Sequence, residues 1–293
     1  MSHHDGHRHG DQHGHAHDEE KSAIDWVAEA DRLVRAAADD AAWYAQSAAL
    51  LLRPQDKIAV DFACGGAGMA TALAAASSGL TVVGVDRDAA MYASVTDRLP
   101  GVRFATGSFE DTPAALREAI GGAPDLLWAR NAVHHADNGQ DAVDTLAATL
   151  APGGRLALAE GGLKPRFLPY DLGIGEPGLE DGLAAATHAA YRRVAHHVRM
   201  DYDWPVALRR AGLTDVTTLP VLTDLRAPLS EADRERVIRT LTRLVDYRRE
   251  DLDPDDLAAW NRLLDPADEA WIGHREDLYH LEVRTIHIGH KPT

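Results

Sequence analysis

The most informative stretch of the sequence reads Val60-Asp61-Phe62-Ala63-Cys64-Gly65-Gly66-Ala67-Gly68. It completes an apolar segment from Lys57 that predicts a short buried strand, and it precedes an alanine-rich segment, 69–77, that predicts a helix. The small side chains of the turn let a ligand approach the backbone closely. We therefore expect a ligand site where the first strand of an α/β sheet meets its first helix.

A second acid marks the end of the next predicted strand. Residues 80–85 are apolar and lead into Asp86, 25 residues beyond Asp61. The strands of a doubly wound sheet present their carboxyl ends at one edge, where ligands bind and where an acid can hold ribose hydroxyls. Both carboxylates are therefore expected at the same edge of the sheet.

Strands and helices alternate on both sides of this turn. Strands are predicted over 57–62, 80–85, 102–106, 125–129, 155–160, 216–225 and 281–288. Helices are predicted over 24–52 with a break at Asp39-Asp40, and over 69–77, 88–98, 113–120, 140–150, 179–198, 206–211, 230–249, 254–264 and 266–279. Residues 161–177, rich in Gly and Pro, are expected to be irregular. This order predicts an α/β fold with a doubly wound, seven-stranded, mostly parallel sheet and helical additions that form a cap.

Composition excludes several classes of function. Lys and Arg total 30 against 46 Asp and Glu, a formal net charge of -16, and a nucleic-acid binder would need clustered basic residues. No run reaches the roughly 18 apolar residues of a membrane-spanning helix, and no signal-peptide pattern opens the chain. Cys64 is the single cysteine, so no internal disulfide or multi-cysteine metal site can form. We expect a cytoplasmic protein with neither nucleic acid nor membrane as a partner.

The first 20 residues differ from the rest. They hold seven of the sixteen histidines, separated by Gly, Asp and Gln. A segment with so few apolar residues cannot bury enough surface to fold, which predicts a disordered tail. Two alternatives stay open: a labile site for Zn²⁺, Ni²⁺ or Cu²⁺, and an expression tag.

Five motifs, in this order, resemble those of the class I S-adenosylmethionine-dependent methyltransferases. Residues 61–67 match the family's Asp-x-Gly-x-Gly-x-Gly with Ala in two Gly places, and Asp86 is the second acid. The other three are Gly107-Ser108-Phe109-Glu110-Asp111, the strand from Asp125 that continues into Arg130-Asn131-Ala132-Val133-His134-His135, and the turn Leu150-Ala151-Pro152-Gly153-Gly154-Arg155-Leu156. The resemblance covers about residues 55–160, and more loosely the last two strands.

The resemblance implies a Rossmann-like methyltransferase fold and S-adenosylmethionine as cofactor, with S-adenosylhomocysteine as product. It implies four parts: a tail (1–20), N-terminal helices of the cap (21–54), the cofactor-binding core (55–160) and a remainder (161–293) with cap insertions at about 161–204 and 226–280. The expected cofactor-binding residues are Asp61, Ala63, Cys64, Gly65, Asp86, Arg87, Met91, Ser108, Phe109, Glu110, Arg130 and Asn131.

Some of these residues have plain structural alternatives. Ser108 and Glu110 suit a cap or turn, and Phe109 could fill the core. Cys64 fits a backbone-contact position better than a nucleophile, because no redox motif surrounds it. A nicotinamide-dependent dehydrogenase is disfavoured, because residues 63–68 lack the G-x-G-x-x-G fingerprint and Asp61 would repel a pyrophosphate.

The reaction requires an acceptor site and, for an acceptor that starts protonated, a base. His134 and His135 are the candidate catalytic residues, since imidazole titrates near neutrality. The candidate acceptor-binding residues come from the irregular parts: Tyr44, Arg166, Tyr170, Tyr191, His196 and Trp204, with His197 and Tyr202 beside them. No spacing supports a metal site among these histidines.

The acceptor class follows by elimination. The chain lacks an Asn/Asp-Pro-Pro-Tyr motif, a cysteine pair for covalent RNA chemistry and a basic face. We expect a small organic molecule, methylated at O, N or C, in secondary metabolism, and a homodimer is compatible with the cap. Two alternatives remain: another S-adenosylmethionine-using enzyme on this fold, and a non-catalytic metal-binding or regulatory protein acting through the His-rich tail.

Overall fold

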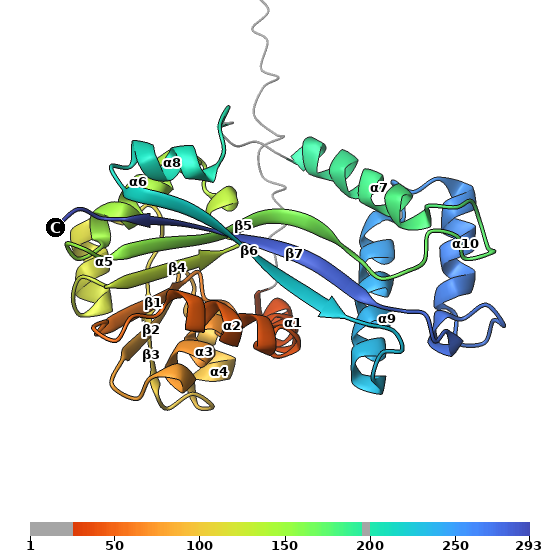
Figure 1. The fold of residues 1–293 in the computed structure, drawn as a ribbon, viewed down its shortest axis with the longest axis horizontal. Coiled ribbons are helices and arrows are strands. Elements are labelled where there is room, and N and C mark those ends of the chain that lie inside the picture. The colour runs from red at the N-terminus through yellow and green to blue at the C-terminus, as the bar shows by residue number, and fades with distance from the viewer. Residues whose placement is uncertain (1–25, 195–199) are drawn as a thin grey trace, which may run out of the picture.

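The computed structural model describes residues 26–194 and 200–293, which contain a sheet in the order β3-β2-β1-β4-β5-β7-β6 (Figure 1). Strands β1 to β5 run parallel, and β7 is antiparallel to both of its neighbours. The strands are β1 (Ile58–Phe62), β2 (Thr81–Asp86), β3 (Val102–Thr106), β4 (Leu126–Arg130), β5 (Arg155–Arg166), β6 (Thr214–Leu225) and β7 (His280–His290). The predicted seven-stranded, mostly parallel sheet is confirmed.

Helices cover both faces of the sheet. One face packs Ala59 and Trp128 against α1–α4, and the opposite face packs Val60 and Leu127 against α5, α6 and α8. The alternation of neighbouring strand residues between two apolar layers is what a buried parallel strand requires. The helices are α1 (Trp26–Asp39), α2 (Ala41–Leu51), α3 (Gly68–Ala76), α4 (Ala89–Thr96), α5 (Pro113–Ile120), α6 (Gly139–Thr149) and α8 (Trp204–Arg210).

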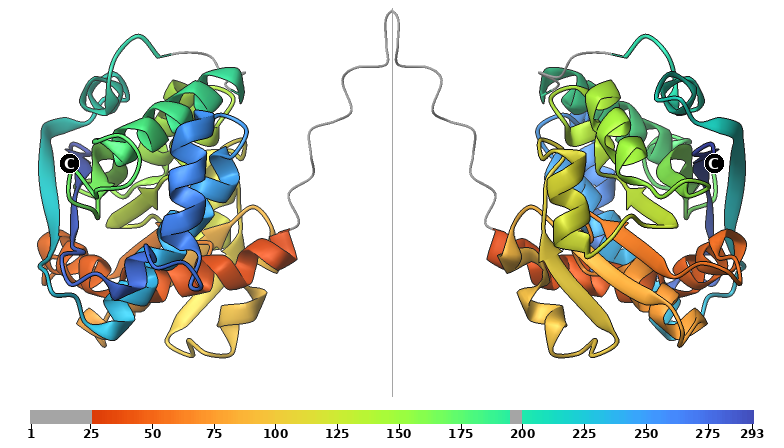
Figure 2. Two further views of the ribbon diagram at one scale, coloured as in Figure 1. Left: turned by 90° about the vertical axis from the view of Figure 1, so that its right-hand side faces the viewer. Right: turned by 90° about the vertical axis from the view of Figure 1, so that its left-hand side faces the viewer.

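A second lobe lies beyond the carboxyl ends of the parallel strands. Strands β5, β6 and β7 are twice as long as the others and carry this lobe, which we call the cap lobe: α7 (Leu179–Val194), α9 (Glu231–Arg248) and α10 (Pro254–Leu264) (Figure 1). It has its own apolar core, centred on Val237, Leu241 and Trp260. Helix α1 lies between the two lobes (Figure 1), and the turned views show it running across the lower half of the molecule (Figure 2). Because β5 runs on into the cap lobe, the carboxyl ends of β1, β2 and β4 face it.

The structure corrects the expectation that residues 161–177 are irregular from their first residue. Strand β5 continues to Arg166 through Gly161 and Gly162, which have positive φ angles of 74° and 119°. A Cβ on Gly162 would lie 2.1 Å from the Val283 carbonyl oxygen, so only glycine passes here. The register of β5 against β7 shifts between Ala159 and Gly162, which is the mark of a β-bulge.

The predicted helix over 266–279 is wrong: only a short 3₁₀ turn, Ile272–His274, forms there. Asp265 and Asp268 explain this difference, since their carboxylates each accept a hydrogen bond from the backbone N–H two residues on, at 2.9 Å. Such local side-chain bonds offer the backbone an alternative to the helix. The predicted helix over 179–198 is described as far as Val194, and its last residues lie outside the described part.

No helix within residues 26–194 and 200–293 is long and apolar enough to cross a membrane.

The predicted start of α9 is confirmed in detail. The Ser230 hydroxyl accepts a hydrogen bond from the Asp233 N–H and caps the helix at the predicted first residue.

Candidate functional site

The loop between β1 and α3 is built from residues in the left-handed backbone region. Ala63, Gly65 and Ala67 have φ angles of 54°, 45° and 55°. Alanine rarely adopts this region, and such strain gathers at functional sites, where the surrounding structure holds it. The loop is fixed by hydrogen bonds from the Cys64 N–H to the Val85 carbonyl and from the Ala67 N–H to the Cys64 carbonyl, at 3.0 and 2.7 Å.

The outer side of this loop is covered by the N-terminal helices. A Cβ on Gly66 would lie 2.3 Å from the Leu33 carbonyl oxygen of α1, and one on Gly68 would meet the Tyr44 ring of α2. These glycines are required for close helix packing. Helices α1 and α2 therefore support the loop rather than merely cap the molecule.

Asp61 is a buried carboxylate, 4% exposed, near the end of β1. Its Oδ2 accepts a hydrogen bond from the Ala70 N–H in the first turn of α3, at 2.9 Å. Burial raises the pKa of Asp61 from 3.8 to about 7, and the nearby Asp86 charge raises it further against the opposing effect of the Ala70 bond. The loop thus holds an acid whose charge lacks a full counterion.

Asp86 ends β2 and is 7% exposed. Its two oxygens accept the Gly65 and Arg87 N–H groups, both at 2.9 Å, so this side chain ties the loop to β2. Burial raises the pKa of Asp86. A carboxylate has about four acceptor positions, so further positions are available for a ligand's hydroxyl groups.

In the loop after β3, Ser108 and Glu110 take part in a turn, and Phe109 packs on another aromatic ring. The Ser108 hydroxyl binds the Glu110 carboxylate, and the Ser108 N–H binds Asp111 at 2.8 Å, as in a turn. Phe109 packs on Phe62, with ring centroids 5.1 Å apart. The Gly107 N–H bonds to the Asp86 carbonyl, so this loop stands beside Asp86 at the same edge.

Arg130, the last residue of β4, is the centre of a buried ionic cluster. Its guanidinium donates to Asp40 at 2.8 Å and to the Tyr44 hydroxyl at 2.5 Å, and Arg284 of β7 reaches the other Asp40 oxygen at 3.0 Å. The Trp43 ring lies under both guanidinium groups. Although burial raises the pKa of Asp40, the two arginines lower it overall. This cluster joins the α1–α2 junction to the sheet.

The fit of S-adenosylmethionine to this edge can be tested on the donor set. The ligand edge presents two buried carboxylates, Asp61 and Asp86, and a loop of small residues. Arg130, a basic side chain at the same edge, is ion-paired with Asp40. An anionic pyrophosphate would be repelled here, whereas a cofactor with a sulfonium, an ammonium and ribose hydroxyls matches the acids.

The two candidate catalytic histidines form a 3₁₀ turn just after β4, with ring centroids 4.1 Å apart. His134 is half-buried and His135 is exposed. His134 Nδ1 lies 2.8 Å from Oε2 of Glu160, at the end of the apolar run of β5. Asn131 precedes the pair with a φ of 47°.

Two residues at this edge, Glu160 and Asp40, were not predicted from the sequence. Glu160 is 3% exposed and also accepts the Ala132 and Val133 N–H groups, at 2.9 and 3.1 Å. An acid ending an apolar strand was the signal that singled out Asp86, and the same signal would have found Glu160. No sequence signal marks Asp40 as the partner of Arg130.

The candidate acceptor-binding residues are not brought together. Tyr44 lies at the β1–α3 loop; Arg166 is ion-paired with Asp181 in the cap lobe, and Tyr170 is exposed there. Trp204 packs against the core beneath α6 and α8. The side chain of Tyr191 on α7, together with His196, His197 and the His-rich tail, lies outside the described residues.

Met91, Arg87 and Cys64 complete the residues that were expected to bind the cofactor. Met91 is buried, and Arg87 is exposed beside Asp86. Burial raises the pKa of the Cys64 thiol well above its usual value, which disfavours a nucleophilic thiolate. No group of three or more metal-ligating side chains is present in the described part of the chain.

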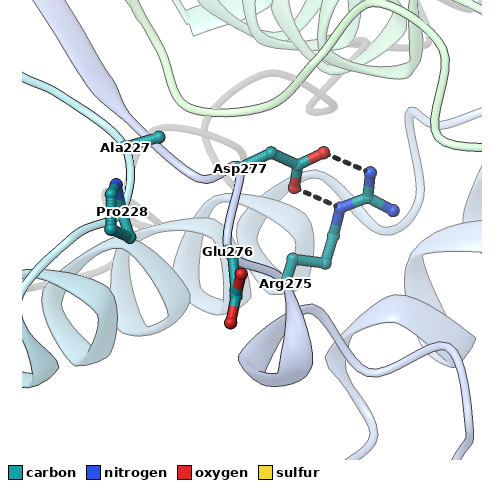
Figure 3. A pocket seen from close by; sticks show the side chains of 5 residues that line it. All are labelled: Ala227, Pro228, Arg275, Glu276 and Asp277. Carbon is teal, nitrogen blue, oxygen red and sulfur yellow. Dashed lines mark hydrogen bonds and ion pairs between the residues drawn. The ribbon is translucent and has the colours of Figure 1, made fainter.

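A shallow recess in the cap lobe does not belong to this site. It is lined by Ala227, Pro228, Arg275, Glu276 and Asp277, and Arg275 forms an ion pair with Asp277 at 2.7 Å (Figure 3). None of its lining residues comes from the carboxyl ends of β1, β2 or β4.

Comparison with known proteins finds similarity over the same region. Residues 60–158 match the family model described as "Methyltransferase domain". Trans-aconitate 2-methyltransferase of Paracidovorax citrulli is 36% identical over 99 residues, which are 34% of this chain and 36% of that protein. The Delftia acidovorans protein of the same name is 33% identical over 104 residues, 36% and 38% of the two chains. The aligned part spans little more than a third of each relative's length.

Among solved structures, an O-methyltransferase family protein from Burkholderia thailandensis is 14% identical, with a TM-score of 0.48 over 92% of this chain and 60% of that one. The segment that matches the family model begins in β1 and ends in β5. It therefore contains the loop of residues 60–68, Asp61 and Asp86, and the histidine pair 134–135. Over residues 60–158, this chain is similar to the methyltransferase domain that the family model describes, and these residues contain the motifs on which the resemblance rests.

Proposed function

We propose that this protein transfers a methyl group from S-adenosylmethionine to a small organic molecule. The observation that carries the proposal is the pair of buried carboxylates, Asp61 and Asp86, that the loop of residues 63–67 holds at the carboxyl ends of β1 and β2. Two acids with raised pKa values are costly unless a ligand uses them. A cationic cofactor rich in hydroxyl groups would use both.

Each part of the edge has a role in this proposal. Asp86 would bind the ribose hydroxyls, and the backbone of Ala63, Cys64 and Gly65 would line the cofactor. The other residues proposed to contact it are Asp61, Arg87, Met91, Ser108, Phe109, Glu110, Arg130 and Asn131. When bound, S-adenosylmethionine supplies an electrophilic methyl group, and the chain supplies orientation and a suitable electrostatic environment.

The acceptor is proposed to be small because the cap lobe faces the carboxyl edge and the chain has no excess of basic residues. The relatives' name specifies trans-aconitate for those proteins, so this acid is one of the acceptors to test beside phenols and amines. Methylation at O, N or C, a place in secondary metabolism, a cytoplasmic location and a homodimer belong to the same proposal. His134 and His135 are its candidate catalytic residues.

The experiment is calorimetric titration of the protein with S-adenosylmethionine and with S-adenosylhomocysteine. Asp86→Ala should weaken binding at least tenfold, because it removes the proposed ribose acceptor and a tether of the loop. Asp277→Ala, in the cap-lobe recess, is the matched control and should bind like wild type. Equal affinity of Asp86→Ala and wild type would contradict the cofactor assignment. Incubation with methyl-labelled cofactor and a panel of acids, phenols and amines then identifies the acceptor.

A further inference from the structure

We propose that Glu160 is a positioning residue that makes His134 a general base, and that the acceptor therefore carries a proton which it loses on methylation. The inference rests on the proposed function and deepens it. It favours a hydroxyl or amine acceptor over a carboxylate, which reaches an enzyme already deprotonated.

The backbone of β5 aims the Glu160 side chain. The bulge between Ala159 and Gly162 interrupts the pairing of β5 with β7 at this residue, and a bulge of this kind re-aims a side chain. The Glu160 carbonyl is itself held by the Thr285 hydroxyl, at 2.6 Å, and contacts the His287 ring, at 3.2 Å. These contacts hold the main chain of Glu160 in place, and this fixes the direction in which its side chain leaves the strand.

The carboxylate then uses both oxygens on the turn after β4. Oε1 accepts the Ala132 and Val133 N–H groups, and Oε2 lies 2.8 Å from His134 Nδ1. Glu160 is 3% exposed, while the His134 side chain is 28% exposed. The acid is thus an internal support and the imidazole is the member of the pair that solvent or a ligand can reach.

This arrangement selects one tautomer of the imidazole. A carboxylate with two backbone donors on one oxygen accepts the Nδ1 proton on the other, which places the free lone pair of neutral His134 on Nε2. The hydrogen bonds of the described residues engage Nδ1 and leave Nε2 without one. An imidazole with a lone pair on Nε2 and a carboxylate bonded to Nδ1 is the arrangement that general-base catalysis needs.

The proton and electron balance is simple. The acceptor's O–H or N–H proton moves to His134 Nε2 and forms an imidazolium, which the Glu160 charge stabilises. The electron pair of that bond becomes the nucleophile that binds the methyl carbon, and the carbon–sulfur bond breaks with its electron pair on sulfur. A carboxylate acceptor would need no such proton transfer.

The arginines of this edge support the same acceptor class. Arg130 and Arg284 are both ion-paired with Asp40, and Arg284 also contacts Glu282 at 2.6 Å. Their charges are compensated inside the fold. A polycarboxylate acceptor would have to displace these acids, whereas an acceptor with a hydroxyl or amine would not.

The decisive variant is Glu160→Gln. The glutamine carbonyl can keep the two backbone bonds, but its NH₂ group donates to His134 Nδ1 and forces the proton onto Nε2. Long-range ¹H–¹⁵N NMR of histidine-labelled protein without cofactor should show Nδ1–H in wild type and Nε2–H in Glu160→Gln, with His134→Gln as the assignment variant. A purely structural role of Glu160 would leave the tautomer unchanged between the two proteins.

Activity supplies the second measurement, with catechol and trans-aconitate as probe acceptors at saturating cofactor. Transfer to catechol should fall about 100-fold or more in kcat in Glu160→Gln and His134→Gln, with cofactor affinity within twofold of wild type. His274→Gln, on the 3₁₀ turn of the cap lobe, should retain the wild-type rate. A wild-type Nε2–H tautomer, catechol methylation that survives both variants, or a wild type that methylates trans-aconitate but not catechol would overturn the proposal. Failure of wild type to bind S-adenosylmethionine would instead refute the proposed function and leave the tautomer result intact.

Discussion

Replacing Asp61 by Asn should make the free protein more stable at neutral and alkaline pH. The variant keeps a side-chain oxygen that can accept the Ala70 N–H bond but carries no charge. In wild type, burial raises the pKa of this carboxyl from 3.8 to about 7, so ionisation opposes folding. The protein thus accepts a destabilising charge at the place where we propose that a cationic cofactor binds.

The magnitude follows from the pKa. A rise from 3.8 to about 7 is roughly three units, and each unit corresponds to about 1.4 kcal/mol, which gives about 4 kcal/mol. The folded state binds the proton more tightly than the unfolded state, so its contribution to stability is complete below the unfolded pKa and is lost as pH rises through the folded pKa. The loss therefore falls between about pH 4 and pH 7, and Asp61→Asn should not show it.

The assay is urea unfolding of both proteins, without cofactor, at several pH values from 4 to 8. The difference in unfolding free energy, variant minus wild type, should rise by about 3–4 kcal/mol across this range. Its absolute value carries a constant offset of about 1–3 kcal/mol, because the buried Asn NH₂ group must also find partners. The pH dependence of the difference is therefore the quantity to measure.

Asp277→Asn is the control of opposite sign, because a hydrogen bond from Arg275 lowers the pKa of Asp277. Losing that carboxylate should destabilise the protein towards neutral pH. If the Asp61→Asn difference stayed flat from pH 4 to 8, the buried, uncompensated charge would be absent and the electrostatic argument for the cofactor edge would fail.

Three further outcomes are expected. Asp40→Asn should lower the unfolding free energy by about 1.5–3 kcal/mol in urea titrations, because it removes the charge that pairs with both Arg130 and Arg284; a loss below about 0.5 kcal/mol would show that the cluster is not a structural tie. Gly66→Ala should cost about 1–3 kcal/mol and weaken cofactor binding, since its Cβ meets the Leu33 carbonyl; Gly79→Ala, with open space around it, is the control. Deletion of residues 1–20 should leave cofactor affinity and turnover within twofold, whereas a metal-buffering protein would lose its function with this segment.

Most strands and helices of the sheet and its covering layers were predicted from local sequence patterns. The strand from Lys57 to Phe62, the turn of small residues and the break at Asp39-Asp40 were all predicted, because each depends on periodicity or on turn chemistry within a few residues. The predicted helix over 266–279 failed because two aspartates hold nearby N–H groups, a competition that apolar spacing does not reveal. The cap lobe's separate core could not be foreseen, since it packs residues 167–186 against residues 225–278.

The candidate site also contains residues that the sequence predicts and a residue whose role only the fold reveals. Asp61 and Asp86 were found because each lies at or next to the end of an apolar strand, and parallel strands must bring such ends to one edge. Glu160 ends an apolar strand too, but its function depends on a bulge that turns it towards a histidine 26 residues earlier. The bulge requires glycine at position 162, because a Cβ there would clash with the Val283 carbonyl. This close approach exists only once β5 and β7 are paired.

The sequence by itself determined the order of strands and helices, the small-residue loop and the acids at the strand ends, because these follow from neighbours in the chain. Only the tertiary structure decided which charges compensate one another. Asp40 meets Arg130 across 90 residues, and His134 receives its carboxylate from another strand. Pairing energies of this kind depend on distance and burial, and both are properties of the assembled fold.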